Sequence, residues 1–130
     1  MKILYAFMVL VLTTAFQSPA DDIDRTAQLI GAANIAELYK DFAPVIDLAI
    51  MDNESQSSAA AAKNLLTDFF DKHPPRSMKV LHRITSSPKF HYGVILLATE
   101  DGTFRIAFSL KNNNGHYQLT ELRIESGKEN

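Results

Sequence analysis

The stretch GVILLATEDGTFRIAFSL at residues 93–110 decides the fold, because it contains two apolar strands joined by a tight turn. The turn is Asp101-Gly102, whose two residues suit the positive φ angles of a two-residue hairpin. Apolar side chains recur at every second position on both sides of the turn, so one face of the hairpin is buried. The register that follows places Leu97 opposite Ile106, Ile95 opposite Phe108 and Gly93 opposite Leu110.

A further strand is expected after this hairpin, at about residues 116–125, beyond the loop at residues 112–115. Simple pairing from that loop would bring a glutamate onto the buried face, because the apolar phase of the strand slips by one position. A β-bulge near Thr120 restores the phase. The corrected pairing places Ile106 opposite Leu122.

The N-terminal half predicts three helices. The first begins after Asp21 or Asp22, and the second begins at Ile35, where Asn34 and Glu37 form a capping box. The third is expected from about Ser58 to Lys72, with Ser57 as its cap and a stripe of apolar side chains at helical spacing. Two prolines, Pro74 and Pro75, prevent its continuation.

Strands follow these helices, which predicts an α+β fold. Residues 45–51 form a short strand, and residues 52–56 are a polar turn. Four long strands complete the chain, at about 78–85, 90–99, 103–111 and 116–125. We therefore expect three N-terminal helices packed on an antiparallel sheet of four long strands plus one short strand.

Residues 1–20 have the pattern of a secretory signal peptide: a positive start, a short apolar run, and small residues before Ala20. We expect cleavage there, a single domain over residues 21–130, and a periplasmic or secreted protein with no membrane span after cleavage. The net charge of −2 with mixed signs offers no attraction to nucleic acid. The chain has no cysteine, which excludes disulfides and a thiol nucleophile.

A cavity lined by Phe69, Phe70, His82 and Gly93 is the first candidate ligand site. The phenylalanines lie on the last turn of the third helix and point at the core. The expected register sets His82 opposite Gly93, where the missing side chain leaves room for water or a ligand. The alternative for His82 is a core histidine held by one hydrogen bond. His91 is expected to face solvent.

A second candidate cluster contains Arg105, Arg123, Glu121 and Glu125. The expected register places the two arginines opposite each other, which is unfavourable unless an acid lies between them. Either the two glutamates form a solvated charge ladder with them, or the arginines bind an anion.

The outer face of the sheet is the third candidate, as a protein interface. It is more apolar than a solvated face requires, at Val94, Leu96, Ala98 and Ala107.

The search for other chemistry is negative. No two histidines have metal-ligand spacing, no nucleotide or phosphate motif is present, and we expect no cofactor and no catalytic set.

The chain resembles the exported bacterial family called domain of unknown function 4783, in the nuclear-transport-factor-2-like superfamily. The matching phrases are Ala33-Asn34, Asp68-Phe69-Phe70, His82, Phe104 to Ile106 and Leu122 to Glu125. The resemblance implies a cone-shaped fold with a curved sheet and an exported protein. It implies no reaction, because the family has no assigned activity and the superfamily includes isomerases, dehydratases and binding domains.

Three functions remain open from the sequence. The lack of a catalytic set favours a non-catalytic domain that binds a small apolar ligand or a protein partner, through the cavity or the sheet face. An isomerase or dehydratase with His82 as its base is the second. The third is a structural homodimer, which a sealed core without a cavity would favour.

Overall fold

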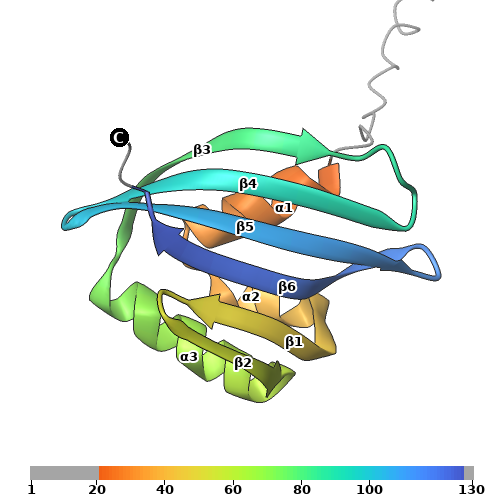
Figure 1. The fold of residues 1–130 in the computed structure, drawn as a ribbon, viewed down its shortest axis with the longest axis horizontal. Coiled ribbons are helices and arrows are strands. Elements are labelled where there is room, and N and C mark those ends of the chain that lie inside the picture. The colour runs from red at the N-terminus through yellow and green to blue at the C-terminus, as the bar shows by residue number, and fades with distance from the viewer. Residues whose placement is uncertain (1–20, 128–130) are drawn as a thin grey trace, which may run out of the picture.

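The computed structural model describes residues 21–127, which form an α+β fold (Figure 1). In chain order its elements are α1 (Asp21–Gly31), α2 (Ile35–Leu38), the 3-10 turn η2 (Tyr39–Asp41), β1 (Phe42–Ile50), β2 (Asn53–Ser58), α3 (Ala59–Lys72), β3 (Pro75–Ile84), β4 (Phe90–Thr99), β5 (Gly102–Asn113) and β6 (His116–Ser126). The predicted signal peptide lies outside the described residues. Within them, no helix is both long enough and apolar enough to cross a membrane.

Side-chain caps begin the second and third helices. The Asn34 side chain accepts a hydrogen bond from the N–H of Glu37 at 3.2 Å, as the capping box predicts. Ser58, one residue later than predicted, accepts from the N–H of Ala61 at 3.1 Å. Each cap satisfies a backbone donor that has no partner inside its helix. The predicted second helix is shorter than expected, because it tightens into η2 after Leu38.

The six strands form one mixed sheet in the order β2-β1-β6-β5-β4-β3. The four long strands β3 to β6 are antiparallel to their neighbours as predicted, whereas the short strand β1 joins β6 in parallel and β2 joins β1 antiparallel. β2 occupies residues that were predicted to be a turn. Its sequence is polar throughout and carries no apolar alternation, and it pairs with β1 through its backbone.

The hairpin of β4 and β5 keeps the predicted faces but shifts its register by two residues. Gly102 pairs with Thr99, so the turn residues are Glu100 and Asp101, and Ile95 lies opposite Ile106. A shift of two leaves every side chain on its predicted face, because the side-chain period of a strand is two.

The predicted bulge in β6 is present. Ser109 pairs with Glu121 and Leu110 with Leu119, so Thr120 has no opposite residue in β5. Ile106 lies opposite Ile124 rather than Leu122, because the preceding turn is the two-residue turn Asn114-Gly115 and not the longer loop expected. The bulge brings the apolar residues on both sides of it to the core.

The core fills the space between the helices and one face of the sheet. In Figure 1, α1 and α2 lie behind the strands and α3 runs along β2, whereas no helix of the described residues covers the near face of β3 to β6. The completely or almost completely buried side chains include Ile23, Leu66, Ile95, Leu97, Ile106, Phe108 and Leu122. The sheet therefore has one buried face and one open face.

Candidate functional site

The face of the sheet turned away from the helices is the first candidate binding surface, and we call it the open face. Its side chains form rows across the strands, because directly opposed residues share a face. From β3 toward β2, the rows are Ile84, Tyr92, Ser109, Glu121, Asp47 and Gln56; His82, Val94, Ala107, Arg123, Ala49 and Glu54; Lys79, Leu96, Arg105 and Glu125; and Ser77, Ala98 and Thr103.

The half of the open face on β3, β4 and β5 carries most of its apolar side chains, beside the charged Lys79 and Arg105. Ile84, Phe90 and Tyr92 are 50%, 51% and 38% exposed. Beside them lie the four residues that the sequence placed on the outer face, which are buried or half-buried by their neighbours: Val94, Leu96, Ala98 and Ala107. Exposed apolar surface of this kind is typical of a protein contact.

The other half of the open face is polar and carries a groove of about 390 Å³ on β6, β1 and β2. Its charged lining residues are Asp47, Glu54, Glu121 and Arg123. The Arg123 guanidinium lies 3.4 Å from a carboxylate oxygen of Glu54 and 4.0 Å from one of Glu125. The open face thus changes from apolar at one end to charged at the other.

The predicted contact between two arginines was wrong. Arg105 lies opposite Glu125, and Arg123 lies opposite Ala107, because the tight turn at Asn114 shifts the register of β6. Opposite charges on neighbouring strands stabilise this arrangement. The acidic residues of the expected charge ladder are present, and the geometric argument for a bound anion between two arginines does not hold.

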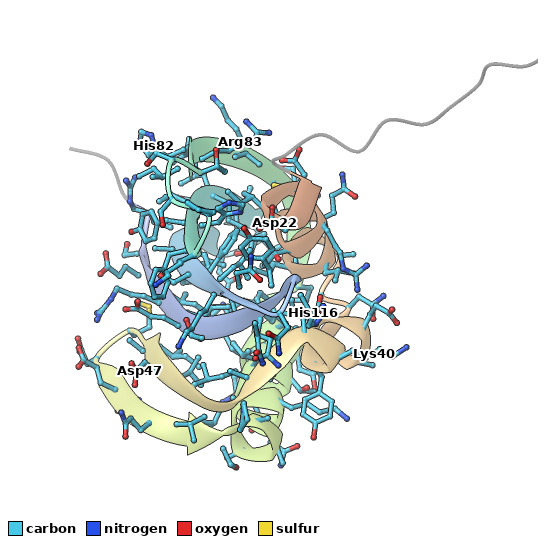
Figure 2. The ribbon with its side chains drawn as sticks, turned by 90° about the vertical axis from the view of Figure 1, so that its right-hand side faces the viewer. Asp22, Lys40, Asp47, His82, Arg83 and His116 are labelled. Carbon is cyan, nitrogen blue, oxygen red and sulfur yellow. The ribbon has the colours of Figure 1, made fainter. Side chains whose placement is uncertain are left out.

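His82 does not lie beside Gly93, so that prediction was also wrong. The pairing of β3 with β4 slips after Val80, leaving Leu81 without an opposite residue. One extra residue turns the following side chains to the other face, so His82 lies opposite Val94 and is exposed. In Figure 2, His82 lies on the side of β3 away from α1, on the same side of the molecule as Asp47.

The space expected beside Gly93 is occupied. A Cβ atom on this glycine would lie 2.6 Å from Phe108 Cζ and 3.0 Å from Ile23 Cγ2. The missing side chain therefore lets a phenylalanine ring cross the strand closely and leaves no room for a ligand there.

The paired phenylalanines of α3 belong to the core, and one of them also borders a groove. Phe69 and Phe70 are 6% and 4% exposed, and their rings meet edge to face at 5.1 Å. Phe69 lines a groove of about 340 Å³ between α3 and the β1–β2 hairpin, which we call the α3 groove. Its other lining residues are Leu48, Ile50, Met51, Asn53, Ser55, Leu65, Asp68, Lys72 and His73.

A buried hydrogen bond that the sequence did not reveal joins α1 to β4. His91 Nδ1 lies 2.6 Å from an oxygen of Asp22, and the imidazole is 8% exposed. The ring of Tyr117 stacks on it at 4.3 Å, and the Tyr117 hydroxyl donates to the Pro88 carbonyl at 2.7 Å. The sequence did contain a sign of this burial, because His91 lies an even number of residues before the inward Ile95 and Leu97 and so shares their face of the strand. The adjacent bulky Phe90 and Tyr92 made the opposite face look like the buried one at this end of the strand.

The position of this pair suits a structural contact between α1 and β4 better than contact with a substrate. The neighbouring pocket, of about 210 Å³, is lined by Asp22 and Tyr117 but not by His91. Its other charges already pair with one another, since Asp41 contacts both Arg25 at 3.2 Å and His116 at 3.5 Å. Within residues 21–127, no cluster of three or more acidic, histidine or cysteine side chains has a geometry for a metal ion.

The sequence profile of the family described as "Domain of unknown function (DUF4783)" matches residues 23–125. The chain belongs to this family. Two DUF4783 crystal structures share its fold. One, from Bacteroides ovatus, has 21% identity and a TM-score of 0.75 over 80% of this chain and 94% of that chain. The other, from Bacteroides uniformis, has 22% identity and a TM-score of 0.76 over 82% and 97%.

The DUF4783 fold also occurs in designed proteins. A de novo designed protein with a curved β-sheet has a TM-score of 0.67 at 14% identity, over 81% of this chain and 98% of that one. Another designed protein, described as "Rd1NTF2_04 with long sheet", has a TM-score of 0.67 at 14% identity, over 82% of this chain and 99% of that one. The curved α+β arrangement is therefore of the nuclear-transport-factor-2-like type, with six strands where the sequence predicted five. No curated protein matches the sequence.

Proposed function

We propose that this DUF4783 domain is a non-catalytic binding module, and that its open face holds a second copy of the same chain. The observation that carries the proposal is the run of apolar side chains from Ile84 and Tyr92 to Leu96, which no helix of the described residues covers. Covering such a surface removes apolar area from water, which is the dominant favourable term in protein association.

The filled interior favours a binding site on the outer surface of the protein over a ligand site inside it. Phe108 and Ile23 fill the space beside Gly93, and His82 lies on the open face instead of in the core. An isomerase that uses His82 inside the cone would therefore lack its base. The one strongly buried histidine, His91, is enclosed by Asp22 and Tyr117.

The charges of the open face favour a second copy as the occupant. Arg105 lies opposite Glu125, Lys79 lies on the edge strand β3, and Glu121 lies on β6 inside the sheet. A two-fold interface brings the same surface together twice, so it needs both signs on one face. The open face carries an apolar region with charges of both signs beside it, which meets that requirement.

The test is sedimentation velocity of the full chain, expressed with its own first twenty residues, against the variant Leu96→Glu. We expect a dimer whose dissociation constant rises at least about a hundredfold in the variant. Each chain contributes its own glutamate to a two-fold interface, so dimer formation would bury two new charges. Leu65→Glu is the matched control, since it makes the same change at an exposed leucine of α3. Equal masses for all three proteins would reject the proposal.

A further inference from the structure

The two edges of the sheet differ in how well they are protected against pairing with another strand. β3 begins at Pro75, breaks its regular pairing at Arg76 and at Leu81, and carries Lys79. Proline, bulges and lysine are devices that discourage a further strand. β2 has none of them: it pairs regularly with β1 from Asn53 to Ser58, and residues 53–56 are exposed.

The unprotected edge borders the α3 groove. Asn53 and Ser55 of β2 line the groove on one side, and Leu65, Asp68 and Lys72 of α3 line it on the other. Helix and strand run in opposite directions here, since the start of β2 faces the end of α3 (Figure 1). A free strand edge beside an apolar helix groove is the arrangement in which an extended peptide adds as an extra strand.

The α3 groove has both exposed apolar side chains and charged side chains without an ion-pair partner among residues 21–127. Leu65 and Met51 are 43% and 44% exposed at its wall. Asp68 and Lys72 lie one helical turn apart, and neither forms an ion pair within residues 21–127. The pairing of these two side chains with each other, which their spacing permits, is not formed.

The spacing of these charges matches an extended chain. Four residues of α-helix rise about 6 Å, and side chains two apart on a strand lie about 6.6 Å apart on one face. An extended segment can therefore place a basic side chain against Asp68 and an acidic one, two residues away, against Lys72. A preceding apolar side chain then falls near Leu65.

We propose that the α3 groove binds an extended segment of a partner polypeptide, which adds antiparallel to β2. Antiparallel addition makes the segment run in the same direction as α3, so its order is apolar-x-basic-x-acidic on the side that faces the helix. The antiparallel ladder is slightly more stable per residue than the parallel one. This surface is separate from the open face, because α3 lies on the opposite side of the sheet.

Fluorescence anisotropy with two labelled eight-residue peptides tests the proposal. Both peptides have alternating valines, and they differ only in the order of one lysine and one glutamate placed two positions apart. The full chain should bind the basic-x-acidic peptide about tenfold more tightly than the reversed one, since two ion pairs become two repulsions. The double variant Asp68→Lys with Lys72→Asp should invert that preference.

Three results would overturn the proposal. They are no saturable binding of either peptide, equal binding of both, or a preference that the double variant leaves unchanged. Both substituted residues are exposed, so the double variant should fold, and its circular dichroism spectrum checks this. A small molecule that co-purifies with the chain and is lost in Leu65→Glu, without peptide binding, would assign the groove to a small apolar ligand instead.

Discussion

Replacing Gly93 by alanine tests whether the interior is closed. The new Cβ would lie 2.6 Å and 2.8 Å from two atoms of the Phe108 ring, distances well below the ordinary contact range of 3.4–4 Å. Phe108 is completely buried and cannot swing into solvent. Overpacking of this kind costs about 1–3 kcal/mol, against a gain of about 0.4–1 kcal/mol from a less flexible unfolded chain.

Because the contact is so short and Phe108 cannot move away, the overpacking cost should be in the upper part of its range, about 2–3 kcal/mol. We therefore expect Gly93→Ala to lower the free energy of unfolding by about 1–2.5 kcal/mol. Urea unfolding followed by circular dichroism measures it, provided that the slope with denaturant is unchanged. Phe108→Leu provides the control: because it removes the ring atoms that clash, its cost should be smaller in the Gly93→Ala background, by about 0.5–3 kcal/mol. A neutral or stabilising Gly93→Ala would mean that there is room beside Gly93, and the cavity expected from the sequence would stand.

Four further substitutions test the packing and the capping of the fold. His91→Gln should lower the free energy of unfolding by about 2–3 kcal/mol, because it leaves the Asp22 carboxylate without its partner; a change below about 0.5 kcal/mol in urea unfolding would show that the pair stabilises little. Ser58→Ala should cost about 1 kcal/mol by removing the cap of α3, visible as faster hydrogen exchange at its first turn, whereas unchanged exchange would speak against the cap. Phe70→Ala should cost about 3–5 kcal/mol in thermal unfolding, but Leu65→Ala, at an exposed position, under about 1 kcal/mol; similar losses would contradict the assigned burial.

The sequence predicted which side chains of the β4–β5 hairpin face the core, because apolar alternation fixes faces even when the register slips by two residues. The same reasoning located the bulge at Thr120, from the phase slip between Leu119 and Leu122. Both features depend on burial, and burial leaves a readable pattern in the sequence.

Features that depend on the backbone were not predictable in this way. β2 pairs through its peptide groups, so its polar residues 53–56 resembled a turn. The irregularity at Leu81 has no mark in the side-chain pattern, yet it moves His82 from the core to the open face. The partner of His91 lies 69 residues away on α1, and a single sequence gives no measure of such a contact.

Native mass spectrometry of the wild-type protein, purified from its native source, tests the central claim most directly. The proposed function predicts an assembly of two chains that carries no small molecule, and that separates into single chains in Leu96→Glu. A single chain that retains a small molecule would contradict it and would return the binding site to the interior or the α3 groove.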